Sequence, residues 1–219
     1  MTSNSELTSF SLTIGDVSLS HEDVQSLAPG AFLSDLIISY AFQAIEQTAS
    51  QSTTSSVRLV QPATVMMASC GIVGDDLASM VAPLGLDAAD VVFLPVNDNA
   101  SPDRAYGGSH WSLVVFRRST GSFHHYDSYS GHNGRVARRV CAAFATALGA
   151  PAAAAFVDET GATPQQGNGF DCGIHVICVA EALQRGDASL SDVRRRVETR
   201  RVELRSAIME AVAAKYAQP

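Results

Sequence analysis

Cys172 is the residue best placed for nucleophilic chemistry, because it lies where a polar loop, residues 164–170, meets a strongly apolar helical segment, residues 171–184. Backbone N–H groups and the positive dipole end at a helix start favour a thiolate, the nucleophilic form of cysteine. Gly173 has no side chain and keeps space clear beside the sulfur. We therefore expect a thiol that attacks a carbonyl carbon and forms a covalent intermediate.

Such a thiol needs a base beside it and a group that orients the base. His110 follows a Gly-Gly-Ser turn before an expected strand at 111–116, and Asp127 ends the next expected strand, 122–127. A short turn at 119–121 joins the strands, so antiparallel pairing would make His110 and Asp127 neighbours. Taken alone, a histidine at a strand start is more often a surface or capping residue.

Two glutamines in the loop before Cys172 could supply the amide donor for an oxyanion. Gln166 lies six residues before Cys172, and Gln165 is its competitor. The backbone N–H of Cys172 would be the second donor. Spacing alone does not choose between the glutamines, and a polar loop also carries such pairs for solvation alone.

The other three cysteines are expected to be inert. Cys178 lies inside the apolar helix, Cys141 is on the apolar side of another, and Cys70 precedes Gly71 at a helix end with no base nearby in the sequence. No C-x-x-C pair or zinc-like spacing occurs, so we expect neither metal nor cofactor. Reduced thiols and the polar residues 1–10, which lack a secretory pattern, favour a cytoplasmic or nuclear location.

Two further histidine motifs are better explained by packing. His124 and His125 alternate along a strand, so they point to opposite faces and cannot bind one metal ion together. His175 lies one helical turn after Cys172 but belongs to an apolar helix, which favours a packing role over that of a second base.

The elements that must position these residues predict an α+β fold. A helix begins at Ser34 and keeps apolar residues at helical spacing as far as Ile45. The other predicted elements, besides those above, are a helix from Asp75 to near Pro83, a strand at 91–96, a helix at 133–148, a strand at 155–158 and a final helix capped by Ser189 or Ser191. We expect a flexible N-terminus at 1–9, one domain at 10–219 and loops at 49–56 and 97–109.

The composition is globular, with 46% hydrophobic and 17% charged residues. A net charge of -7 argues against a protein that mainly binds nucleic acid, and no apolar run approaches the roughly 18 residues of a membrane span. Six arginines between Arg194 and Arg205 form a positively charged cluster in this otherwise acidic chain. Glu198 and Glu203 interrupt them, and Arg194 can pair with Glu198, so a solvated helix face is favoured over a nucleic-acid patch.

Three blocks of the sequence together resemble the ubiquitin-like-protein-specific cysteine proteases, the sentrin-specific protease family related to adenovirus protease. The blocks are His-Trp-Ser-Leu at 110–113, Tyr-Asp-Ser at 126–128 and Pro-Gln-Gln-x-Asn-x-x-Asp-Cys-Gly at 164–173. The resemblance runs from about residue 20 to residue 183. Within the family it is strongest to the deneddylase branch, through residues 93–99, 107–109 and 123–128.

The resemblance implies a papain-like, adenain-type fold with a central, mostly antiparallel sheet flanked by helices. It implies that His110, Asp127 and Cys172 form a catalytic triad, with Gln166 as the oxyanion glutamine. Trp111 would cover a narrow tunnel that admits only a diglycine tail. The candidate substrate-binding residues are Trp111, Phe32, Asp35, Asn97, Asp98 and Ser109.

Two positions depart from the family pattern, since Phe32 replaces a tryptophan and Ser34 an asparagine. An aromatic wall of the tunnel is kept, but the sequence does not determine how wide the tunnel is. The implied function is cleavage after the C-terminal Gly-Gly of a ubiquitin-like modifier, with the neddylation modifier favoured over SUMO or ubiquitin. A catalytically inactive modifier-binding module and an acetyltransferase are the competing classes. The implied partners are the modifier and its conjugates, the expected state is a monomer, and no nucleic acid or membrane is expected.

Overall fold

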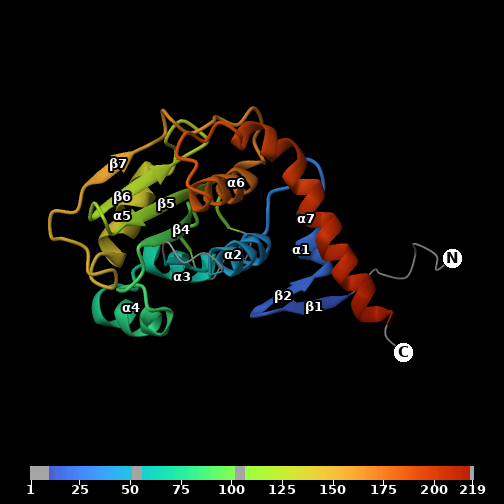
Figure 1. Cartoon of the computed structure of the whole chain (residues 1–219), viewed down its shortest axis with the longest axis horizontal. Helices are drawn as coiled ribbons and strands as arrows, with labels where there is room; N and C mark the ends of the chain where they lie inside the picture. Colours follow the sequence, from blue (N-terminus) through green and yellow to red (C-terminus); the bar gives the residue numbers. More distant parts are fainter. Residues whose placement is uncertain (1–9, 51–55, 102–106, 218–219) are drawn as a thin grey trace.

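The computed structural model describes residues 10–50, 56–101 and 107–217 (Figure 1). Its helices are α1 (His21–Gln25), α2 (Asp35–Ser50), α3 (Pro62–Ser69), α4 (Gly74–Val81), α5 (Gly134–Phe144), α6 (Cys172–Gln184) and α7 (Val193–Tyr216). Its strands are β1 (Ser11–Ile14), β2 (Val17–Ser20), β3 (Val57–Leu59), β4 (Val91–Asn97), β5 (Trp111–Arg117), β6 (Ser122–Tyr126) and β7 (Phe156–Asp158). The predicted flexible segment 1–9, residues 51–55 of the predicted loop 49–56 and residues 102–106 of the predicted loop 97–109 lie outside the described residues. The loop at 97–109 begins one residue later than predicted, because Asn97 is the last residue of β4.

The central sheet has five strands in the order β3-β4-β5-β6-β7. β4 and β5 pair antiparallel over seven residue pairs and β5 and β6 over five, whereas the parallel edge pairings, β3 with β4 and β6 with β7, have three each. The sheet is therefore mostly antiparallel at its centre, as predicted.

Helices cover both faces of this sheet (Figure 1). Because side chains alternate along a strand, Leu113 and Val115 of β5 join one buried cluster with α2, α6 and α7, while Val114 and Phe116 join a second cluster with α3, α4 and α5. This arrangement holds the start of α6 against the start of β5, where the predicted nucleophile and base lie.

Several elements differ from the sequence predictions, and the helix predicted at 133–148 ends at Phe144. Ala49 and Ser50 belong to α2 and not to a loop, because the buried Ala49 extends the apolar face of the helix. The last helix begins at Val193, with Asp192 at its N-cap, since Leu190 has a φ of 54° in the left-handed region and interrupts any helix begun earlier. The β1–β2 hairpin was not predicted, because its four-residue strands are too short for a clear alternating pattern.

The last helix also differs from prediction in its surroundings. Figure 1 shows α7 lying along α6 and reaching the β1–β2 hairpin, where Lys215 Nζ donates to the Ser11 carbonyl at 2.8 Å. Arg201 is only 7% exposed, so the predicted solvated face does not include every arginine. Within the described ranges, no helix is both long enough and apolar enough to cross a bilayer.

Candidate active site

His110 and Asp127 meet at the edge of the β5–β6 hairpin. His110 directly precedes β5 and Asp127 directly follows β6, and His110 Nε2 donates to Asp127 Oδ1 at 2.7 Å. The two side chains are 4% and 0% exposed. The predicted proximity of these two residues is confirmed. Asp127 is one residue beyond the strand, and this frees its carboxylate to cap the turn that follows.

The Asp127 carboxylate is held by three donors. Oδ1 also accepts from the N–H of Tyr129 at 2.8 Å, and Oδ2 accepts from the N–H of Asn133 at 2.8 Å. Burial raises the pKa of Asp127, but hydrogen bonds from His110, Asn133 and Tyr129 outweigh it and lower the pKa below its ordinary value. The carboxylate therefore stays ionised and orients the imidazole.

His110 is held in its charged form. Burial opposes the imidazolium, but the hydrogen bonds to Asp127 and then to Cys172 outweigh it and raise the pKa of His110 from 6.5 to about 9. Since Nε2 is engaged by Asp127, Nδ1 is the ring nitrogen left for Cys172. An imidazolium beside a thiol stabilises the thiolate, which is the reactive form.

Cys172 is the first residue of α6 and is 1% exposed. The described helix start thus gives its sulfur the backbone dipole expected from the sequence. A Cβ on Gly173 would lie 2.9 Å from two side-chain atoms of Leu33. Glycine at this position therefore also lets the start of α6 approach the segment that carries Phe32.

The other cysteines have different surroundings. Burial raises the pKa of both Cys141 and Cys178 to about 12, so neither forms a thiolate near neutral pH. Cys70 is partly exposed, and its sulfur lies 3.9 Å from the Asn99 carbonyl oxygen. All four cysteines are free, and Cys172 is the one in contact with a histidine.

Hydrogen bonds separate the two glutamines that the sequence left as competitors. Gln165 Nε2 donates to the carbonyls of Asp127 and Thr163 at 3.0 and 2.9 Å, and its Oε1 accepts from the Ser130 N–H at 2.8 Å, so its amide is used in holding loops together. Gln166 Nε2 donates to the Asn168 carbonyl at 2.7 Å, which uses one of its two hydrogens. Gln166 thus keeps an N–H for an oxyanion.

Asp98 and Ser109, which we predicted to bind substrate, contact each other and position the base. Asp98 accepts hydrogen bonds from the Ser109 N–H and from Ser109 Oγ, the latter at 2.6 Å. It also accepts the His110 N–H at 2.9 Å. Burial raises the pKa of Asp98, but these bonds outweigh it and lower the pKa. Asn97 is buried, and its Oδ1 accepts the Asn99 N–H at 2.8 Å.

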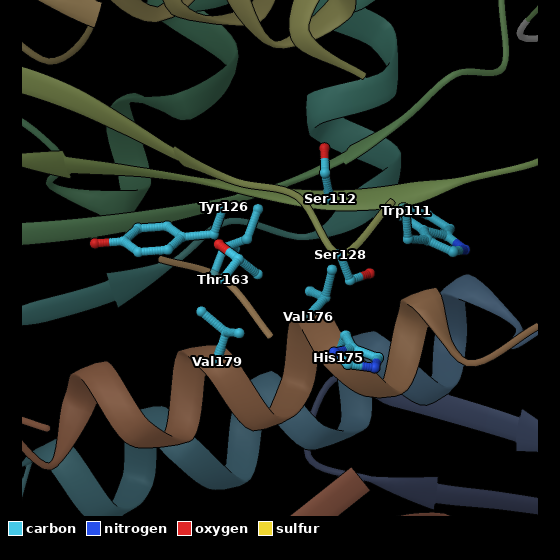
Figure 2. A pocket seen from close by; sticks show the side chains of 9 residues that line it. Trp111, Ser112, Tyr126, Ser128, Thr163, His175, Val176 and Val179 are labelled. Atoms are coloured by element: carbon cyan, nitrogen blue, oxygen red, sulfur yellow. The ribbon is translucent and has the colours of Figure 1, made fainter. Parts of the chain in front are cut away.

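The other predicted substrate-binding residues lie around α6 and the start of α2. Trp111 lines a small pocket between β5, β6 and α6, into which His175, Val176 and Val179 project from the helix (Figure 2). Phe32 is 58% exposed, so its ring is available to a partner. Burial raises the pKa of Asp35, against the opposing hydrogen bond from the Leu36 N–H.

His175 and His125 occupy the buried environments expected for packing residues. His175 is buried, which lowers its pKa to about 4 and keeps its ring neutral. His125 is buried and hydrogen-bonded to Ser112 Oγ at 3.0 Å, whereas His124 is partly exposed and contacts Glu159 at 2.8 Å, so the two rings face opposite sides as predicted. In the described part of the chain, no group of three His, Cys, Asp or Glu residues could hold a metal ion.

Asn133 and Ser128 are positioning residues to which the sequence assigned no role in the site. Asn133 is fully buried, and its Nδ2 donates to the carbonyls of Val96 and His110, both at 3.2 Å. Ser128 Oγ donates to Gln166 Oε1 at 2.8 Å and so fixes the direction of that amide. Asn133 was predicted only to open a helix, and an Asn directly after a polar turn carries no further signal.

Comparison with known proteins agrees with this geometry. A model described as the Ulp1 protease family, C-terminal catalytic domain, matches residues 81–219. Sentrin-specific protease 8 of Homo sapiens is 36% identical over 173 residues, which are 78% of this chain and 80% of that protein. NEDD8-specific protease 1 of Arabidopsis thaliana is 34% identical over 172 residues, 78% of this chain and 74% of its own.

Solved structures support the fold. The C-terminal Ulp1 protease domain in complex with Smt3, the yeast ortholog of SUMO, superposes with a TM-score of 0.63 at 18% identity, covering 86% of this chain and 85% of the other. The predicted fold class is confirmed. The chain is therefore a cysteine protease that belongs to the Ulp1 protease family.

Proposed function

We propose that this protease cleaves after the C-terminal Gly-Gly of a ubiquitin-like modifier and that its modifier is NEDD8. The observation that carries the chemistry is the contact of His110 with both Asp127 and Cys172, together with the pKa of His110, which these contacts raise to about 9 against the opposing effect of burial. The choice of NEDD8 is supported by relatives named NEDD8-specific protease 1 and sentrin-specific protease 8, at 34% and 36% identity.

In the proposed reaction, the Cys172 thiolate attacks the carbonyl carbon of the terminal glycine. The resulting oxyanion accepts hydrogen bonds from the spare N–H of Gln166 and from the Cys172 backbone N–H. His110 gives its proton to the departing amine, and a thioester to the modifier remains. Neutral His110 then takes a proton from water, whose oxygen attacks the thioester and releases the modifier carboxylate and the thiolate.

Substrate selection in this proposal depends on the segment before α2 and on β5. Trp111 and Phe32 would flank the diglycine tail, since an exposed aromatic ring suits a surface that glycine backbone must approach closely. Asp35 lies three residues after Phe32 at the start of α2 and would face the basic side of a modifier. Asp98 and Ser109 contribute indirectly, through the position of His110.

Covalent capture tests the proposal. NEDD8, SUMO and ubiquitin, each with a thiol-reactive group in place of the C-terminal carboxylate, are incubated with the wild-type protein and with Cys172→Ala and Cys70→Ala variants. We expect a mass shift of one NEDD8 in the wild type and in Cys70→Ala, but not in Cys172→Ala.

Each outcome is decisive. Capture of SUMO or ubiquitin in preference to NEDD8 would overturn the choice of modifier while keeping the chemistry. Capture by Cys172→Ala would overturn the assignment of the nucleophile. Failure of folded wild-type protein to react with any of the three modifiers would refute the proposed function.

A further inference from the structure

Arg201 joins three segments that meet beside the nucleophile. Its Nε and Nη2 donate to Asp171 Oδ1 at 3.1 and 2.8 Å. Nη1 donates to the carbonyls of Ser26 and Ala28 at 2.7 and 3.2 Å, and Nη2 also donates to the Phe170 carbonyl at 3.2 Å. The planar guanidinium satisfies four acceptors at once, which the single ammonium of a lysine could not do in this geometry.

Two of these acceptors, Phe170 and Asp171, belong to the segment that directly precedes Cys172. Asp171 directly precedes Cys172 and is the N-cap residue of α6. Asp171 Oδ2 accepts from Asn168 Nδ2 at 2.8 Å, and the Asn168 carbonyl accepts from Gln166 Nε2. A continuous chain of contacts therefore connects α7 to Gln166, the proposed oxyanion donor.

The second branch reaches the segment that carries Phe32. Ser26 Oγ accepts the Ser34 N–H at 3.0 Å, so the turn before α2 is tied to the loop that Arg201 holds. Phe32 lies in the sequence between these tied residues, so its backbone is anchored on both sides, while its ring is exposed. Arg201 of α7 therefore binds both the segment before Cys172 and the loop before α2, whereas the sequence predicted only a solvated helix.

Charge gives Arg201 a second role. Asp171, with its side chain 18% exposed, carries its carboxyl group in the residue next to Cys172. A carboxylate so close disfavours a second negative charge unless a cation neutralises it. Among the described residues, the other ionisable groups near Cys172 include His110, with Asp127 behind it, and His175 on α6, whose pKa burial lowers to about 4. Arg194 of α7 also acts on His175 and lowers its pKa further. Arg201 is the cation that faces Asp171.

We propose that Arg201 is a positioning residue of the hydrolytic site, which neutralises Asp171 beside Cys172 and fixes the two segments that flank the nucleophile. The inference rests on the proposed role of Cys172 as the nucleophile. The effect of the Asp171 charge can be separated from an effect on loop folding. If charge is the cause, removing both Asp171 and Arg201 charges should restore the Cys172 reactivity that removing the Arg201 cation alone lowers.

The test measures the rate at which iodoacetamide alkylates Cys172 between pH 4 and 9, followed on the Cys172 peptide by mass spectrometry. In Arg201→Met, the pH of half-maximal rate should rise by about one unit, because the Asp171 carboxylate is left unpaired. In the double variant Asp171→Asn/Arg201→Met it should return to within about 0.3 units of the wild type. Arg195→Met is the matched control, since Arg195 pairs with Asp192 on the same helix with its side chain 75% exposed, and it should leave the profile unchanged.

Asp171→Asn alone keeps the inference testable if Arg201→Met does not fold. This variant leaves the Arg201 cation without its partner carboxylate, so the half-maximal pH should fall. A rise in Asp171→Asn, a double variant as displaced as Arg201→Met, or an Arg201→Met profile identical to the wild type would overturn the inference. Alkylation needs no modifier, so failure of the wild type to capture NEDD8 would refute the proposed function separately.

Discussion

Asp127→Asn tests the electrostatic reasoning about the site most directly. The substitution keeps the size of the side chain but removes the charge that His110 Nε2 contacts at 2.7 Å. Burial opposes the charged imidazole, and the hydrogen bonds to Asp127 and Cys172 raise its pKa from 6.5 to about 9. That rise corresponds to at most about 3.4 kcal/mol, and because the contact with Cys172 contributes to it, the share of Asp127 is about 2 kcal/mol.

Without Asp127 the alkaline limb of kcat/KM, which reports loss of the His110 proton, should move to lower pH by about one to two units. The maximal kcat/KM should fall by about 10²- to 10⁴-fold, because the imidazole loses both its orientation and its stabilised charge. The assay is hydrolysis of a fluorogenic modifier conjugate from pH 5 to 10. An alkaline limb that stays in place, with kcat/KM within threefold of the wild type, would refute the reasoning.

Three further predictions follow from the same contacts. The pKa of His110 is raised from 6.5 to about 9 in the folded protein, so its stabilising contribution is fully present below pH 6.5 and is lost as pH rises through 9. The Tm should therefore fall between pH 6.5 and 9, and it should fall less in Asp127→Asn. Equal slopes of Tm against pH in the two proteins would contradict this. Gln166→Ala should lower kcat by about 10²- to 10³-fold at nearly unchanged Tm, whereas Gln165→Ala should mainly lower Tm. Steady-state kinetics and calorimetry measure the two effects, and a large loss of kcat in Gln165→Ala with none in Gln166→Ala would contradict the assignment. Asn133→Ala removes the donors to the Val96 and His110 carbonyls and should lower the free energy of unfolding by about 1–3 kcal/mol, measured by urea denaturation. An unchanged urea midpoint would contradict this prediction.

The sequence predicted the parts of the site that depend on local pattern. β5 and β6 are apolar strands joined by the short turn 118–121, so their pairing, and with it the meeting of His110 and Asp127, follows from nearby residues. Cys172 could be placed because a polar loop before an apolar helix marks a helix start. These predictions needed no knowledge of contacts between distant segments.

The rest depends on contacts between distant segments, which a single sequence does not encode as a pattern. Arg201 bonds to residues 30 positions away at Asp171 and 175 positions away at Ser26, and only its place among other arginines was visible beforehand. The choice between Gln165 and Gln166 needed the positions of the acceptor carbonyls, of which Asp127 is 38 residues away. The contact of Asp98 with the His110 backbone was not predicted for a similar reason, since an acidic residue in a loop near a cleft has the same sequence signature whether it faces a substrate or the backbone of His110.

The position of the nucleophile relative to the base depends on how α6 packs against β5. His110 belongs to the sheet and Cys172 to the helix, and the small pocket lined by Leu113, Val176 and Val179 lies between these two elements (Figure 2). A shift of the helix along the strand would separate sulfur from imidazole without breaking a bond inside either element, and a displacement of about 1 Å can cost 10²-fold in rate. Arg201 ties the residue before Cys172 to α7, and Asp98 with Asn133 ties His110 to β4 and the start of α5. The residues that hold Cys172 and His110 in place are therefore as necessary to the chemistry as the three residues that carry it out.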